Sequence, residues 1–174
     1  MPRLRKAVYV SGNTKEILVN WKDYIMTIAS RANQDTNFDF NPPVTGELFT
    51  ELRSELSLQN LPDELVELYK QTNGVDEKMK GVNIGELVWP IEKVINSNKE
   101  FRHAADFKEL YMSFNQLMFF SDAGNGDLFC FVALNGTFHR FDIFVWNHEN
   151  DSRTWVAPNL TKFIEWWVNG KIEI

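Results

Sequence analysis

Apolar positions near the start of the chain recur every three to four residues, which is the spacing of one face of an α-helix. The stretch from Asn13 to Ala32 places Trp21 and Ile25 on such a stripe. Asn13 is expected to cap this helix, because its side-chain oxygen can accept a hydrogen bond from a free amide of the first turn. The following segment, 33–43, is polar and holds two prolines, so we expect a loop there.

Two shorter helices are predicted after this loop. The first begins with Thr45 as its cap and runs to about Leu58. The second begins at Pro62, where the missing backbone amide is harmless, and ends at Asn73-Gly74, a pair that favours a left-handed stop. Residues 76–83 are polar and are expected to form another loop.

The centre of the chain has the pattern of a β-hairpin. Two apolar runs, 117–120 and 128–132, flank the turn residues Gly124, Asn125, Gly126 and Asp127. Glycine and asparagine reach positive φ at low cost, and the aromatic flanks suit a buried, pleated surface. Asp127 is expected to accept hydrogen bonds from neighbouring backbone amides, as a short aspartate does in a turn.

The remaining elements follow from shorter patterns. Apolar runs predict strands at 84–89, 143–146 and 152–156, and Pro90 opens another helical stretch. Residues 103–112 fit no single pattern. The last helix has the clearest period and ends at Asn169-Gly170; its apolar positions are Leu160, Phe163, Ile164, Trp167 and Val168.

The 174 residues contain no internal repeat, low-complexity tract or linker, and we expect one domain. We place it at 13–174, after an N-terminal tail at 1–12. The first basic residues are followed by too few apolar ones for a secretion signal, and no run approaches the roughly 20 apolar residues of a membrane span. These features predict a cytoplasmic protein without a membrane partner.

The formal net charge of −6 is concentrated in one stretch. Between residues 47 and 77 the chain holds eight acidic side chains and two basic ones, and the remainder is balanced. An acidic face repels nucleic acid and attracts a basic protein, although helix surfaces are also often acidic without any such role. The acidic residues are Glu47, Glu51, Glu55, Asp63, Glu64, Glu67, Asp76 and Glu77.

Residue types that carry catalysis or bind metals occur without the spacing that such sites need. The single cysteine, Cys130, excludes an internal disulfide and is expected to be a buried hydrophobe. The three histidines have no cysteine or carboxylate at metal-ligand spacing. The glycine-rich turn lacks the lysine and the helix start of a phosphate loop. We therefore expect no enzyme, metal or cofactor, unless a hydrolase site assembles in three dimensions around His139 or His148.

Two tryptophans flank a polar segment near the end of the chain. Trp146 and Trp155 are predicted to face a surface or groove, because partly exposed tryptophan is frequent at interface hot spots. His148 and Glu149 lie between them and could join a polar cluster. A solvated turn explains these two residues equally well.

Three segments form an ordered set. The first runs from Pro42 through Leu61-Pro62 to Asn73-Gly74, the second from Phe120 to Leu128, and the third from Val145 through Trp155 into the last helix. Together they resemble the SUKH superfamily, which includes bacterial immunity proteins and a fungal regulator of cell-wall synthesis. The resemblance covers about residues 42–170 and leaves the first helix outside it. One departure is Asn147, where the family usually has an acid.

The resemblance implies an α+β fold in which helices pack on a twisted, mainly antiparallel sheet. In bacteria it implies a non-enzymatic role, the binding and neutralising of a toxin domain that is often a nuclease. The acidic stretch would complement a basic toxin surface, with Trp146, His148, Glu149 and Trp155 as further contact candidates. A regulatory or scaffold module of the same fold, with no toxin partner, is the alternative. The sequence leaves the oligomeric state open.

Overall fold

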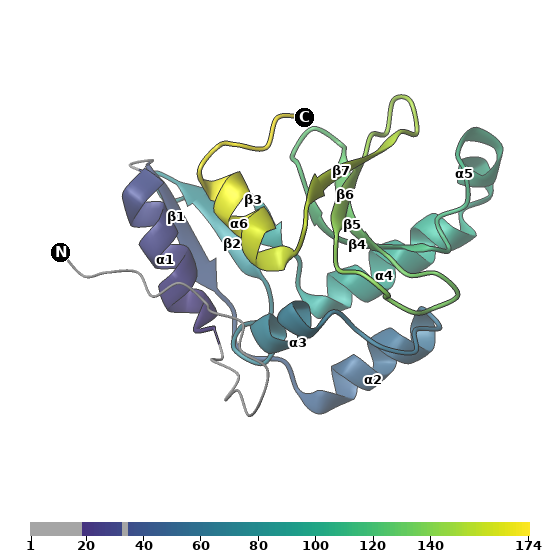
Figure 1. Cartoon of the computed structure of the whole chain (residues 1–174), viewed down its shortest axis with the longest axis horizontal. Coiled ribbons are helices and arrows are strands. Elements are labelled where there is room, and N and C mark those ends of the chain that lie inside the picture. The colour runs from purple at the N-terminus through teal and green to yellow at the C-terminus, as the bar shows by residue number, and fades with distance from the viewer. Residues whose placement is uncertain (1–18, 33–34) are drawn as a thin grey trace, which may run out of the picture.

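A computed structural model describes residues 19–32 and 35–174 (Figure 1). The strands form two antiparallel sheets, with the orders β1-β2-β3 and β4-β5-β6-β7. The α+β class expected from the sequence is confirmed, with two sheets where one was expected. In chain order the elements are α1 (Trp21–Ala32), β1 (Thr36–Phe40), α2 (Gly46–Glu55), α3 (Asp63–Tyr69), β2 (Val75–Met79), β3 (Val82–Val88), α4 (Ile91–His103), α5 (Ala105–Leu110), β4 (Leu117–Asp122), β5 (Leu128–Val132), β6 (Ile143–Trp146), β7 (Arg153–Ala157) and α6 (Leu160–Val168).

Helix α1 begins at Trp21, later than the expected start at Asn13, which itself lies outside the described residues. Asn20 precedes the helix, and its Oδ1 accepts a hydrogen bond at 3.1 Å from the amide three residues on. This is the geometry of a helix cap. Trp21 is buried, and Tyr24 Oη donates to a backbone oxygen of α6, so α1 takes part in the core.

Two segments expected to be loops form strands β1 and β2. Each strand buries a single residue, Phe38 on β1 and Val75 on β2, so neither shows the alternation of apolar and polar residues that marks a half-buried strand. Asp39 and Asp76 lie opposite each other on these strands, and Lys78 Nζ, 2.5 Å from Asp39 Oδ2, offsets their repulsion. Pairing with β3 completes the sheet.

The ends of the helices are close to their expected positions. Thr45 occupies the N-cap position of α2, as expected, although its side chain makes no capping hydrogen bond. Gly74 has φ +86° after α3, in the left-handed region that the Asn-Gly pair predicted. The segment 103–112, which fits no single pattern, holds the end of α4 and the short helix α5.

The predicted hairpin is confirmed as β4 and β5, at the centre of the core. Phe163 of α6 lies 4.7 Å from Phe129 on one face of this sheet, measured between ring centroids. On the other face, Phe101 of α4 lies 5.3 Å from Phe119. The four-stranded sheet is therefore covered by α6 on one side and by α4 on the other. Figure 1 shows α5 projecting beyond the end of α4.

Hydrogen bonds to the backbone of β4 join the two sheets and hold this strand in place. Trp89, next to the end of β3, donates its amide to Phe120 O at 2.8 Å. Asn98 is buried on α4, and its side chain both donates to and accepts from the backbone of Phe119 at 2.8 Å. Because the strands are antiparallel, the β4–β5 and β6–β7 turns then lie at the same end of the sheet. The candidate site is built around these two turns.

Candidate protein-binding surface

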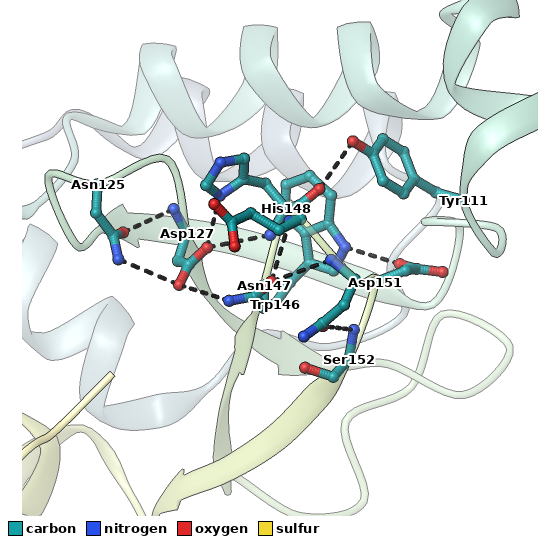
Figure 2. Close-up of polar contacts among 10 residues, drawn as sticks. Tyr111, Asn125, Asp127, Trp146, Asn147, His148, Asp151 and Ser152 are labelled. Atoms are coloured by element: carbon teal, nitrogen blue, oxygen red, sulfur yellow. Dashed lines mark hydrogen bonds and ion pairs between the residues drawn. The ribbon is translucent and has the colours of Figure 1, made fainter.

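The β6–β7 turn, residues 147–152, is held by its own short polar side chains (Figure 2). Asn147 Oδ1 accepts hydrogen bonds from the amides of Glu149 and Asn150, at 3.0 and 3.1 Å. Asp151 has φ +57°, a conformation that aspartate tolerates better than most residues. The sequence therefore encodes a fixed turn, and Glu149 is exposed on it, as the solvated-turn interpretation expected.

Asp127 joins the β4–β5 turn to the β6–β7 turn. Its carboxylate is buried and accepts hydrogen bonds from His148 N at 3.1 Å and from Asn147 Nδ2 at 3.2 Å, while His148 Nδ1 lies 2.7 Å away (Figure 2). The expectation that Asp127 accepts from neighbouring backbone amides is wrong, because the backbone amide that donates to it is His148 N of the other turn. From its own turn it accepts only a side-chain hydrogen bond, from Asn125 Nδ2 at 3.3 Å. Burial acts to raise the pKa of Asp127, but the hydrogen bonds from His148 and Asn125 outweigh it and lower that pKa below its ordinary value.

A second carboxylate ties the β6–β7 turn to the segment after α5. Asp151 accepts hydrogen bonds from Trp146 Nε1 and Met112 N, both at 2.7 Å. Tyr111 Oη donates to His148 O at 2.9 Å from the same segment (Figure 2). Trp146 is only 3% exposed, so its expected place on a surface is wrong. Its apolar ring packs among the aromatic residues under α4, and its polar atom is satisfied inside.

Trp155 lies on β7 and is 48% exposed, as expected for a contact residue. Its Nε1 donates to Asp142 Oδ1 at 2.9 Å, and its ring centroid lies 6.1 Å from that of Trp166 on α6. The hydrogen bond from Trp155 is the main cause that lowers the pKa of Asp142 below its ordinary value. An exposed indole held by two neighbours has little freedom to lose on binding, which suits an interface anchor.

Two hollows share Trp155 in their linings. One, of about 410 Å³, extends toward Trp166 and the last residues of the chain, 171–174. The other, of about 350 Å³, is mostly apolar, and we call it the β7 hollow. It is lined by Val132, Leu134, His139, Arg140, Asp142, Phe144 and Trp155.

Arg140 and Asp142 were not among the predicted site residues; they lie just before the strand expected at 143–146. The Arg140 side chain is 82% exposed, and its Nε lies 2.6 Å from Asp142 Oδ2. The Arg-x-Asp spacing directly before an apolar strand could have predicted this ion pair, because side chains two residues apart lie on the same side of an extended chain.

The acidic residues of the stretch 47–77 are divided among several places. Glu47, Glu51 and Glu55 are exposed on α2, and Glu55 forms an ion pair with Lys99. Asp63 is exposed at the start of α3, and Asp76 is half-buried on β2. Only the α2 residues form the acidic helix face that was expected.

Three other acids of this stretch are engaged within the protein. Glu64 accepts hydrogen bonds from the amide and hydroxyl of Thr161, both at 2.9 Å, at the start of α6. Burial raises the pKa of Glu77, which accepts a hydrogen bond from Trp167 Nε1. Glu67 lies 2.6 Å from Lys70 one turn along α3. Structural contacts thus account for these carboxylates.

Among the groups with catalytic potential, His148 and Asp127 form a hydrogen-bonded pair. Within residues 19–32 and 35–174, no three His, Cys, Asp or Glu side chains lie close enough together to hold a metal ion. Cys130 is buried, as expected, and burial raises its pKa to about 12. His139 is exposed beside the β7 hollow, whereas His148 is bonded to Asp127. None of the described helices is long and apolar enough to cross a membrane.

A sequence model of the SMI1 / KNR4 family (SUKH-1) matches residues 43–166. The chain belongs to this family. The matched range contains both turns and Trp155, and it leaves α1 outside. At the level of the family, the function is that of an immunity protein or a related regulatory module that acts by binding another protein. No match was found among curated proteins.

Proposed function

We propose that this protein is an immunity protein that binds a cognate toxin domain and neutralises it without catalysis. The match to the SUKH-1 family over residues 43–166 is the observation that carries the proposal. The resemblance implies that the toxin is often a nuclease. An immunity protein of this kind acts in the cytoplasm, where it meets the incoming toxin.

Neutralisation by binding requires a complementary surface with a few well-packed anchors. Trp155, fixed between two hollows, has the properties of such an anchor. The exposed glutamates of α2 add a negative field that attracts a basic toxin and speeds the encounter. In this proposal Trp155 lengthens the lifetime of the complex, and the glutamates of α2 raise its rate of formation.

A regulatory or scaffold module that binds an endogenous protein is the second candidate. The SMI1 / KNR4 family match favours it as well, because that group includes a fungal regulator. The same surface would serve either role, so the partner decides between them.

Co-expression tests the proposal. The C-terminal domain encoded by the neighbouring gene is expressed in a susceptible host, with and without this protein, and the two chains are then co-purified. We expect the toxin domain alone to stop growth, and this protein to restore growth and form a stable complex. Normal growth without this protein, or arrest despite it with no complex, would contradict the immunity function and favour the regulatory module.

A further inference from the structure

Strand β7 leaves one edge of the four-stranded sheet open. Within residues 19–32 and 35–174, β6 is its only strand neighbour. Asn147 N donates a hydrogen bond to Ser152 O. In an antiparallel ladder, hydrogen-bonded pairs alternate with pairs that are not hydrogen-bonded. The next pair, Trp146 and Arg153, is therefore not hydrogen-bonded, and Thr154 is the next residue of β7 bonded to β6. The backbone amides and carbonyls of Arg153 and Trp155 therefore point away from the sheet.

This edge is only partly protected against pairing with another chain, by a bulge at Val156 and by the inward-turned charge of Arg153. Natural edge strands are commonly guarded by lysine or proline, and the sequence of β7, Arg-Thr-Trp-Val-Ala, has neither. The side chain of Arg153 is turned inward, where it donates to the carbonyls of Met112 and Ser113. An added strand would therefore meet no outward charge on β7.

The surface beside this edge combines an apolar hollow with the exposed guanidinium of Arg140. Leu134 is 47% exposed and lines the β7 hollow with Phe144 and Trp155. Arg140 lies at the same hollow and binds Asp142 mainly through Nε, so most of its guanidinium donors are left to solvent. A carboxylate is the group that such a guanidinium binds best.

We propose that the partner binds by adding an extended segment to the free edge of β7. A large apolar side chain of that segment fills the β7 hollow against Trp155, and an acidic side chain next to it pairs with Arg140. This inference rests on the proposed function, in which the partner is the toxin domain. Two copies of a chain with a net charge of −6 repel each other, which favours a partner of different sequence over self-pairing.

Binding measurements on variants test the proposal. The probe is the C-terminal domain of the neighbouring gene product, and affinity is measured by calorimetry with full-length wild type and variants. We expect Trp155→Ala to weaken binding by about 30-fold or more and Arg140→Glu by about tenfold. The matched controls are Leu110→Ala and Lys108→Glu on α5, which change exposed residues of the same kinds and should leave affinity within about twofold.

Hydrogen exchange tests strand addition separately from side-chain contact. In the complex we expect the outward amides of Arg153 and Trp155 to exchange at least about tenfold more slowly than in the free protein. Unchanged exchange at both amides would contradict strand addition. A second variant, Trp155→Phe, keeps an aromatic ring and should retain part of the affinity, which separates lost contact from lost folding.

The remaining outcomes separate this inference from the proposed function. A tight complex whose affinity is unaffected by Trp155→Ala and Arg140→Glu overturns the inference and leaves immunity intact. Failure of the wild type to bind the probe overturns both. A dimer of the free protein that dissociates in Trp155→Ala, measured by light scattering, would make the edge a contact between copies and would also overturn it.

Discussion

The carboxylate of Asp127 meets His148 twice: its Oδ1 accepts from the backbone amide at 3.1 Å and lies 2.7 Å from ring Nδ1. These contacts connect two turns that are 21 residues apart in sequence. The β6–β7 turn leads directly into β7, so the pair also fixes the strand that carries Trp155.

Asp127→Asn should destabilise the fold by about 1–3 kcal/mol. The amide that replaces the carboxylate has only one acceptor oxygen and points N–H groups at existing donors. Urea unfolding at neutral pH measures the effect. Asp106→Asn on exposed α5 is the control and should stay within about 0.5 kcal/mol of the wild type. Equal unfolding midpoints for the two variants would contradict the role of Asp127.

Acid should weaken the wild type more than it weakens Asp127→Asn. The folded-state pKa of Asp127 is lowered, because hydrogen bonds from His148 and Asn125 outweigh burial. Such a group stabilises the fold above its unfolded pKa of about 3.9, and this contribution is lost as the pH falls through the folded pKa. Urea unfolding at a series of pH values from neutral to acid gives the two curves. Parallel curves would show that Asp127 contributes no acid sensitivity.

Gly126→Ala should be more damaging than Gly124→Ala. Both residues have positive φ, +101° and +80°, so both substitutions strain the backbone. At Gly126 an added Cβ would also lie 3.0 Å from the His148 ring, whereas at Gly124 no heavy atom lies within 4 Å. We expect losses of about 2–3 kcal/mol and about 1 kcal/mol in the free energy of unfolding. A larger loss at Gly124 would contradict the close contact with His148.

Reversing charge on α2 should slow association with a basic toxin domain. The double variant Glu47→Lys/Glu51→Lys removes two exposed negative charges and adds two positive ones, so the steering field weakens. Stopped-flow binding at several salt concentrations should show a slower association rate, by about tenfold at low salt, and a shallower salt dependence. The control, Asp106→Lys/Glu109→Lys, makes the same charge change on α5 and should have a smaller effect. Unchanged affinity and salt dependence in the α2 variant would exclude electrostatic attraction by α2.

The elements with strong local patterns could be predicted from the sequence. The hairpin of β4 and β5 and the helix α6 carry continuous apolar runs or a clear helical period, and both are found as expected. Strands β1 and β2 were not predicted, because each buries only one residue and shows no alternating pattern. Strand β1 pairs with β2 over about 40 residues, and such distant pairing leaves no local signal. Strands β2 and β3 form a hairpin through Lys80 and Gly81, both at positive φ, and this glycine turn was the local signal for β2.

The candidate site was predicted only in part for a related reason. Trp155 is exposed as expected, whereas Trp146 has the same residue type in the adjacent strand and is buried. Both strands carry their tryptophans on one face of the sheet, and aromatic residues near α4 and α5 cover only the end at which Trp146 lies. The partnership of Asp127 with His148 likewise depends on strand register. Composition and periodicity do not encode that register.

Inhibition of the toxin domain by the purified protein is the decisive measurement for the immunity function. The activity of the neighbouring gene's C-terminal domain is measured on its substrate while this protein is added in increasing amounts. We expect the toxin activity to fall linearly and to vanish at about one equivalent of this protein, as tight binding without turnover requires. Full toxin activity at a large excess of this protein would contradict the immunity function.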